Sequence, residues 1–304
     1  MANEIKDTHK PLHRMWFRNQ QGNNEGNTDE DPSPAEFKQV YGSVADLYHK
    51  FRPRYSEWLI DEAIAKSPSL AGKNPKDLRI LELGCGPGTL TLPLTKRGFN
   101  ITAVEPGEGM VDKAREICKD YDNAVFRQES FEDFSANGQT YDAIVAASSI
   151  HWALSDDKDG ELYAKLHSLL KPNGSLLLFW NFPPEPKDLT LEKVAEVVDE
   201  AKPFYFSGGS VANHRERLHE KILKPLEEST FFSKFENVEE SFNEETSIPD
   251  YLNFLNTLSN YIIMGDDKRQ AFFDMVAEVL AEEHGALLPT YRESLLNVAL
   301  RQDI

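Results

Sequence analysis

The stretch Ile80–Gly88 (ILELGCGPG) constrains the fold of this chain most, because a short apolar run leads directly into three glycines in five residues. The apolar residues predict a buried strand. The glycines let the backbone turn sharply and approach a ligand with no Cβ in the way. The helix expected from Thr89 to about Arg97 then points its first N–H groups at that ligand. This order predicts a doubly wound α/β sheet with a ligand at the turn.

A second expected strand ends on an acidic residue. Ile101–Val104 is the next apolar run, and Glu105 follows it directly. A carboxylate at the tip of the strand beside the turn can accept hydrogen bonds from both ribose hydroxyls of a nucleoside. The two strands together therefore predict a site for a nucleoside-containing cofactor.

The spacing of the glycines separates two classes of cofactor. In the dinucleotide pattern G-x-G-x-x-G the third glycine would stand at position 89, but here it comes one residue earlier, at Gly88. A pyrophosphate favours the longer spacing. The compact E-x-G-x-G-x-G form, which begins here at Glu82, suits a ligand without phosphate whose amino-acid end crosses the turn.

In these residues the chain resembles the class I S-adenosylmethionine-dependent methyltransferases, in particular the small-molecule type 11 group with its trans-aconitate-methyltransferase-like members. The resemblance covers Phe37 to about Trp180 well and the C-terminal third more loosely. It implies S-adenosyl-L-methionine as methyl donor and no metal. The residues that it assigns to the cofactor are Tyr48, Arg52, Glu82, Gly84, Gly86, Gly88, Glu105, Pro106, Met110, Ser130, Phe131 and Ala147.

The segment Tyr48–Tyr55 (YHKFRPRY) resembles the Y-x-x-x-R-P-x-Y segment that closes over the cofactor in this family. There its arginine faces the methionine carboxylate. By that resemblance Arg52 is expected to hold the carboxylate, which a guanidinium grips with two parallel hydrogen bonds. The alternative is a surface arginine beside core aromatic residues.

The end of the fourth expected strand predicts the acceptor site. Tyr141–Ala147 is a continuous apolar run, typical of a strand covered on both faces, and His151 follows it closely. Ligands bind outside the carboxyl ends of such strands. His151 is therefore the candidate catalytic residue: it could accept a proton from a hydroxyl or amine acceptor, bind an acidic acceptor as a donor, or only shape the loop. The expected acceptor-binding residues are His151, Trp152, Trp180 and Asn181.

The rest of the chain predicts one domain with an N-terminal arm. Residues 1–34 are too polar to form a core and are expected to be disordered. The methyltransferase domain, 35–304, is expected to hold seven mostly parallel strands, with the sixth at 235–242 and the seventh at 294–300. Its expected parts are lid helices at 35–66, the cofactor-binding core at 78–180, a cap insertion at 181–234, and C-terminal strands and helices at 235–304. In the helix expected at 266–284, the predicted buried face holds Phe272, Met275, Val276 and Val279.

Composition limits the partners. The chain has 33 Lys and Arg against 51 Asp and Glu, a formal net charge of −18, which disfavours a nucleic-acid partner. Two cysteines make neither a disulfide framework nor a metal cluster. No apolar run is long enough for a membrane span and no apolar signal core stands at the N-terminus, so a cytoplasmic protein is expected, as a monomer or a homodimer.

The resemblance implies transfer of a sulfonium methyl group to a small molecule, with positioning and desolvation supplying much of the acceleration. It suggests a small organic acid as acceptor, through O-methylation of a carboxyl group or S-methylation of a thioether acid. Two alternatives remain open. One is an NAD-type oxidoreductase, for which the later glycine and a Tyr-x-x-x-Lys pair are missing. The other is a non-catalytic cofactor-binding protein of the same fold.

Overall fold

A computed structural model describes residues 44–154, 160–187, 211–262 and 266–303. The expected arm at 1–34 lies outside these residues, as do the start of the expected lid and residues 188–210 of the expected cap. None of the described helices combines the length and the apolar character needed to cross a membrane.

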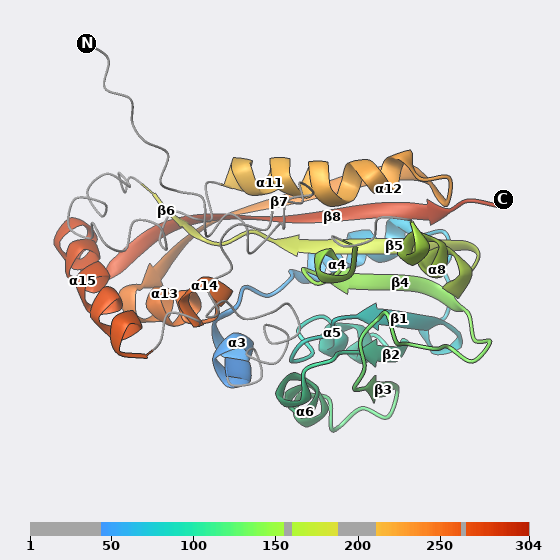
Figure 1. The fold of residues 1–304 in the computed structure, drawn as a ribbon, viewed down its shortest axis with the longest axis horizontal. Coiled ribbons are helices and arrows are strands. Elements are labelled where there is room, and N and C mark those ends of the chain that lie inside the picture. The colour runs from blue at the N-terminus through green and yellow to red at the C-terminus, as the bar shows by residue number, and fades with distance from the viewer. Residues whose placement is uncertain (1–43, 155–159, 188–210, 263–265, 304) are drawn as a thin grey trace, which may run out of the picture.

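The described chain forms one sheet in the order β3-β2-β1-β4-β5-β8, with β7 and the short β6 also paired to β8 (Figure 1). Strands β1 to β5 are parallel, and β8 runs antiparallel to β5 and to β7. The seven-stranded, mostly parallel α/β sheet predicted from the sequence is therefore confirmed, with β6 added. The strands are β1 (Arg79–Leu83), β2 (Asn100–Val104), β3 (Ala124–Arg127), β4 (Tyr141–Ala147), β5 (Leu170–Asn181), β6 (Glu185–Pro186), β7 (Phe232–Ser247) and β8 (Leu287–Arg301).

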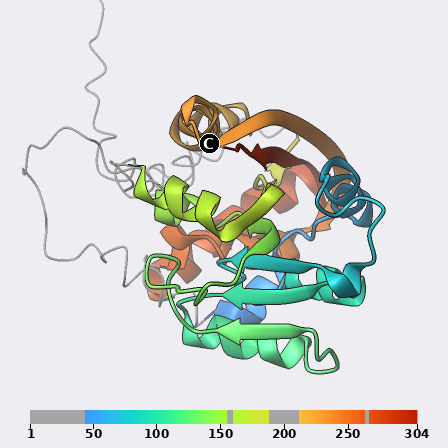
Figure 2. The ribbon, with the colours of Figure 1, turned by 90° about the vertical axis from the view of Figure 1, so that its right-hand side faces the viewer.

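Helices cover both faces of this sheet (Figure 2). Along β5, Leu176 and Leu178 face the core that α8, η4 and α12 complete, whereas Leu177 and Phe179 face the core that α4, α5 and α6 complete. This alternation explains the continuous apolar runs of the central strands. The helices are α3 (Ala45–Phe51), α4 (Glu57–Lys66), η2 (Pro75–Asp77), α5 (Thr91–Lys96), α6 (Glu108–Ile117), α7 (His151–Leu154), α8 (Glu161–Leu169), α11 (Val211–Leu218), the π-helix η4 (His219–Leu223), α12 (Lys224–Glu228), α13 (Ile248–Leu255), α14 (Ser259–Ile262) and α15 (Asp266–His284).

Strands β7 and β8 are much longer than the sequence predicted. Pairing between β5 and β8 stops at Asn181 and Ser294, but pairing between β7 and β8 continues to Ser247 and Leu287. Residues 241–247 and 287–293 therefore form an antiparallel ribbon that projects beyond the carboxyl end of β5, with β6 paired to it at Thr290 and Tyr291. Helices α13, α14 and α15 sit at its tip and are called the C-terminal cap here (Figure 1).

The C-terminal cap has a hydrophobic core of its own, separate from the two cores of the sheet. The buried side chains of α15 include Phe272, Phe273, Val276 and Leu280, whereas Met275 is 37% exposed. The prediction that Met275 is buried was therefore wrong. The buried stripe is rotated, because α15 packs against α13 and against Leu288 at the start of β8.

Candidate active site

A cavity of about 590 Å³ lies where the carboxyl ends of the parallel strands meet the C-terminal cap. One part of its wall is the glycine turn after β1 together with the ends of β2 and β4. The opposite part is built by aromatic and aliphatic side chains. Ligand cavities in proteins commonly have this size and this mostly apolar lining.

The glycine turn forms one end of the cavity, and its backbone requires glycine. Gly84 and Gly86 have φ of +62° and +53°. A Cβ on Gly84 would lie 2.5 Å from Cβ of Ser149, whereas a Cβ on Gly86 would meet no atom within 4 Å. Since Gly86 lines the cavity, the space beside it belongs to the ligand site. Gly88 does not line the cavity, and a Cβ there would press on Ile117 of α6.

Glu105 is held at this turn by two backbone N–H groups. Its Oε2 accepts a hydrogen bond from the N–H of Gly86 at 3.1 Å, and its Oε1 accepts one from Gly107 at 2.9 Å. The side chain is on the cavity wall and is almost fully buried. Each carboxylate oxygen can still accept a further hydrogen bond from a ligand.

Glu82 lies behind the turn rather than on the cavity wall. It is fully buried, and its Oε2 accepts a hydrogen bond from Oγ1 of Thr91 at 2.7 Å. Burial, and to a lesser extent the nearby Glu105, raises the pKa of Glu82 to about 8. The sequence assigned Glu82 to the cofactor, and its position makes it a support beneath the turn.

Arg52 reaches the cavity from the segment between α3 and α4. Its guanidinium lies 4.8 Å from the ring centroid of Tyr48 and 5.5 Å from that of Phe254, and its Nη2 donates to the carbonyl of Thr257 at 2.8 Å. Its buried Nε has no hydrogen-bond partner among the described residues. A cation with a spare donor at this wall suits a carboxylate ligand.

Five further residues that the resemblance assigned to the cofactor also line this cavity, namely Pro106, Met110, Ser130, Phe131 and Ala147. No pattern in the sequence predicted the lysine that supports their loop. Nζ of Lys165, from α8, donates to the carbonyls of Phe131 at 2.7 Å and Glu132 at 3.0 Å. Its contacts fix the loop after β3.

His151 begins α7 and lies among tryptophans. Its ring centroid is 5.0 Å from that of Trp152 and 6.0 Å from that of Trp180. Removal from bulk water lowers the pKa of His151 to about 4, so its imidazole is neutral at neutral pH. A group with this pKa is a weak base, and it does not act as a cation toward an acidic acceptor.

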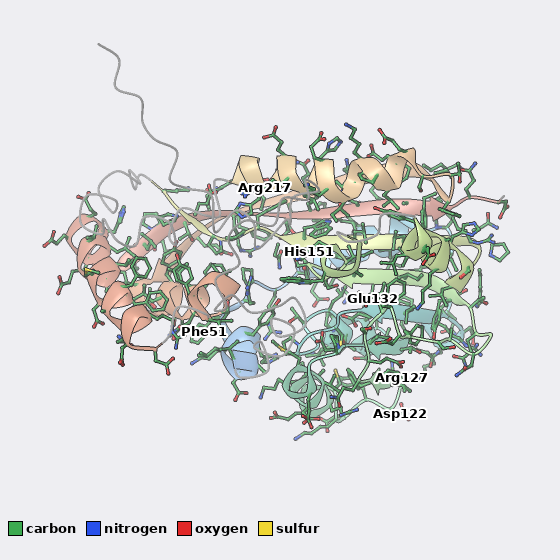
Figure 3. All side chains as sticks on the ribbon, viewed as in Figure 1. Phe51, Asp122, Arg127, Glu132, His151 and Arg217 are labelled. Atoms are coloured by element: carbon green, nitrogen blue, oxygen red, sulfur yellow. The ribbon has the colours of Figure 1, made fainter. Side chains whose placement is uncertain are left out.

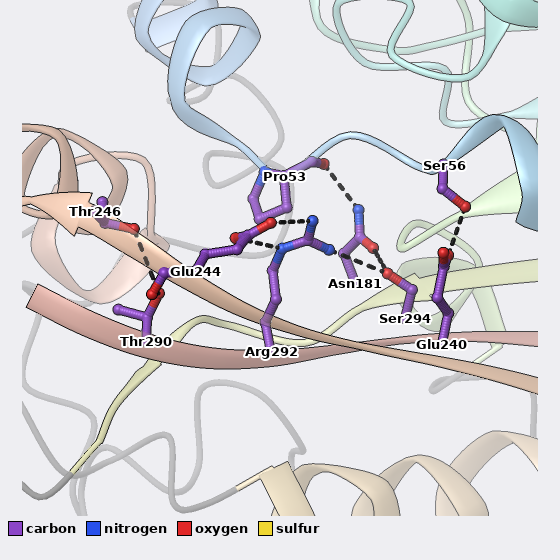
Figure 4. A network of polar contacts seen from close by, with 9 residues as sticks. All are labelled: Pro53, Ser56, Asn181, Glu240, Glu244, Thr246, Thr290, Arg292 and Ser294. Carbon is purple, nitrogen blue, oxygen red and sulfur yellow. Dashed lines mark hydrogen bonds and ion pairs between the residues drawn. The ribbon is translucent and has the colours of Figure 1, made fainter.

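Trp180 and Asn181, the two acceptor-binding residues expected at the end of β5, differ in what their side chains contact. Trp180 presents its ring to the cavity, while its Nε1 donates to Oδ1 of Asn297 at 2.8 Å. Asn181 also reaches the wall, but its side-chain amide bonds to protein groups at both its oxygen and its nitrogen (Figure 4). Among the described residues, no group of three His, Cys, Asp or Glu is arranged to hold a metal ion.

Much of the opposite wall was not predicted as part of the site. Figure 3 labels His151 and Glu132 with Arg217 of α11, and all three line the cavity. The apolar pattern of α13 predicted that the helix is buried, but not what it covers. Tyr55 belongs to the expected Tyr48–Tyr55 segment, and the expected cap insertion contains His214, Arg217, Leu218 and Ile222. No local signal marked the other wall residues, which are Ser148, Tyr251, Phe254, Leu255, Leu258 and Tyr261.

Comparison with known proteins shows that part of this chain is similar to methyltransferases. A family described as a methyltransferase domain matches residues 80–174, from the glycine turn to the start of the apolar part of β5. A Dictyostelium discoideum protein named as a methyltransferase is 26% identical over 237 residues, which cover 76% of this chain and 80% of that protein. Among solved structures, one named as a type II methyltransferase from Anaeromyxobacter dehalogenans matches this fold with a TM-score of 0.55 at 19% identity. The match covers 82% of this chain and 97% of that one, and it supports the fold.

Another relative has a higher sequence identity, but the match covers a smaller part of this chain. The malonyl-[acyl-carrier protein] O-methyltransferase of Halalkalibacterium halodurans is 38% identical over 111 residues. These residues are 35% of this chain and 40% of that enzyme. The chain therefore spans less than half of this relative's length.

Proposed function

We propose that this chain, whose residues 80–174 match a methyltransferase domain, is a class I methyltransferase that transfers the methyl group of S-adenosylmethionine to a small organic acid. The observation that carries the proposal is the single cavity of about 590 Å³ that joins the glycine turn to the aromatic wall around His151. Both reactants of a methyl transfer have to lie in one enclosed space, and this volume is within the range of small-molecule sites.

The residues present fit the proposed cofactor. The open space beside Gly86 would admit the amino-acid end, and Glu105, already fixed by two N–H groups, would accept hydrogen bonds from the ribose. The buried Nε of Arg52 would donate to the carboxylate. When bound, S-adenosylmethionine supplies a methyl group that is already activated by its sulfonium.

The chain's own contribution is to position the acceptor and exclude water. The rings of Trp152 and Trp180 flank His151, and Tyr251 and Tyr261 of the C-terminal cap close the same cavity. An acceptor held between these rings would be aligned with the methyl group and stripped of water, which are two recognised sources of acceleration. A hydroxyl or amine acceptor held there could give its proton to a ring nitrogen of His151.

The low pKa of His151 supports an acidic acceptor. With a pKa of about 4 it is a poor base for a hydroxyl or an amine. A carboxylate is already deprotonated at neutral pH and a thioether has no proton to lose, so neither needs a base. We therefore propose O-methylation of a carboxyl group or S-methylation of a thioether acid. The relative from Halalkalibacterium halodurans, an O-methyltransferase whose named acceptor is a malonyl group, agrees with the first.

Calorimetry tests the cofactor first. S-Adenosylhomocysteine should bind the protein with a saturable isotherm and NAD should not. Transfer of a labelled methyl group is then measured for small carboxylic acids, thioether acids, the methyl esters of the same carboxylic acids, and small alcohols and amines. We expect transfer to acids and none to the esters that lack a thioether. Binding of NAD without binding of S-adenosylhomocysteine would overturn the cofactor, and transfer to alcohols or amines alone would overturn the acceptor class.

A further inference from the structure

We propose that Asn181, expected from the sequence to bind the acceptor, instead positions Arg52 in the cavity by holding the carbonyl of Pro53. The inference rests on the proposed function, since Arg52 is the group assigned to the cofactor carboxylate. Figure 4 shows the contacts that carry it, which run from the ribbon of β7 and β8 through Asn181 to the segment after α3. Asn181 is thus a positioning residue and does not itself bind ligand.

The amide of Asn181 is oriented by two hydrogen bonds of opposite sense. Its Nδ2 donates to the carbonyl of Pro53 at 2.8 Å. Its Oδ1 accepts from Oγ of Ser294 at 2.5 Å. Because Ser294 is the residue paired with Asn181 across β5 and β8, the sheet itself fixes the direction in which Nδ2 points.

An ion pair between the buried Arg292 and the exposed Glu244 anchors the far end of this chain of contacts. Nε and Nη2 of Arg292 donate to the two carboxylate oxygens of Glu244, at 3.0 and 2.9 Å, which joins β8 to β7. The guanidinium also lies 3.6 Å from the ring centroid of Phe242, and its Nη1 donates to Oγ of Ser294 at 3.4 Å. Bidentate pairs of this kind are strong and geometrically specific, so Ser294 is held by a stiff support.

The backbone passes this restraint on to Arg52. Proline fixes its own φ and restricts the residue before it to an extended conformation, and Arg52 has φ −70° and ψ 138°. Holding the carbonyl of Pro53 therefore sets where the side chain of Arg52 begins. The segment that follows Pro53 is held to β7 by a separate contact, because Oγ of Ser56 donates a hydrogen bond to Oε2 of Glu240 at 2.5 Å. From the other side, the carbonyl of Thr257 in the C-terminal cap accepts from Arg52.

Asn181→Asp tests this contact selectively. The new side chain keeps an acceptor for Ser294 but turns an oxygen toward the carbonyl of Pro53, where the lost donor leaves two acceptors facing each other. A matched control is Asn297→Asp, because Nδ2 of Asn297 donates to Asn237 at 2.7 Å in the same sheet, away from the segment of Arg52. Calorimetry should show S-adenosylhomocysteine affinity reduced roughly tenfold in the first variant and less than about twofold in the second.

Double variants separate positioning from general damage. In an Arg52→Met background Asn181→Asp should change the affinity less than about twofold, whereas in a Glu105→Ala background it should keep its roughly tenfold effect. Equal losses in the two Asn→Asp variants, or a roughly tenfold loss that persists without Arg52, would overturn the inference. If Asn181→Asp does not fold, Ser294→Ala takes its place in the same cycles, since it removes the donor that orients Asn181 together with the acceptor of Nη1 of Arg292. Failure of the wild type to bind S-adenosylhomocysteine would instead overturn the proposed function.

Discussion

The two ends of the cavity are built in different ways. The cofactor end is made by the backbone of one short stretch, Gly84 to Gly86, and by Glu105 bonded to that backbone. The acceptor end is made by side chains from α7, α11, α13 and α14, which are brought together from distant parts of the chain. A site made of backbone is fixed by local sequence, whereas a site made of side chains depends on how the elements pack.

The largest effect is expected at the backbone-built end. Gly86→Val should abolish detectable binding of S-adenosylhomocysteine, because the branched side chain would occupy the open space beside the turn. A matched control is Gly285→Val, since Gly285 has φ +70°, also meets nothing within 4 Å and does not line the cavity. Both variants put a β-branched residue at positive φ and should lose a similar free energy of unfolding, of the order of 1–2 kcal/mol. Calorimetry on both variants measures the difference, and equal affinities would remove the turn from the site.

Glu105→Ala should have the next largest effect. It removes the proposed ribose contacts and also leaves the N–H groups of Gly86 and Gly107 without their acceptor. S-Adenosylhomocysteine binding should weaken by roughly 1–3 kcal/mol. Glu108→Ala, which removes an exposed carboxylate at the start of α6, is the control and should bind like the wild type. Unchanged binding by Glu105→Ala would contradict its assignment.

The same contrast explains what the sequence could predict. Strands β1 to β5, the glycine turn and the place of Glu105 follow from short apolar runs and from spacing, both of which are local. The C-terminal cap was not predicted as part of the site. The sequence of α13 shows that the helix has an apolar face, which includes Tyr251 and Phe254, but it does not show which surface this face contacts. The length of the β7–β8 ribbon was missed because β7 is rich in exposed glutamates.

Asn181 illustrates the limit at the level of a single residue. Its position at the end of β5 predicted that it binds the acceptor, and the structure places it on the cavity wall. Its hydrogen bonds to Pro53 and Ser294, however, join segments more than a hundred residues apart in the chain. No local pattern encodes such a contact, and the role of a polar residue depends on it.

A smaller effect is expected at the side-chain-built end. His151→Ala should reduce methyl transfer roughly tenfold while changing S-adenosylhomocysteine affinity less than about threefold, because the residue lies on the acceptor wall. If the acceptor needs deprotonating, wild-type turnover should fall as the pH approaches the pKa of His151, about 4, and the variant should lack that fall. A carboxylate or thioether acceptor would show no His151-dependent fall. Full turnover by the variant would exclude the residue from the site.

The smallest effects are on stability, where the two ends should respond to pH in opposite directions. Glu82 has its pKa raised from 4.5 to about 8, so between these values the native protein keeps a proton that the unfolded chain has lost, and the free energy of unfolding falls as the pH rises. His151 has its pKa lowered from 6.5 to about 4, so below 6.5 the unfolded chain binds a proton that the native protein does not, and stability falls as the pH falls. The two contributions to stability oppose each other between pH 4.5 and 6.5, and only that of Glu82 remains from pH 6.5 to 8.

Glu82→Gln, which keeps an acceptor for Thr91 but cannot ionise, should therefore flatten the decline in stability above pH 6.5, and His151→Ala should not. Urea unfolding across this pH range measures both, and a Glu82→Gln curve parallel to the wild type would show that the carboxyl is ionised beneath the turn.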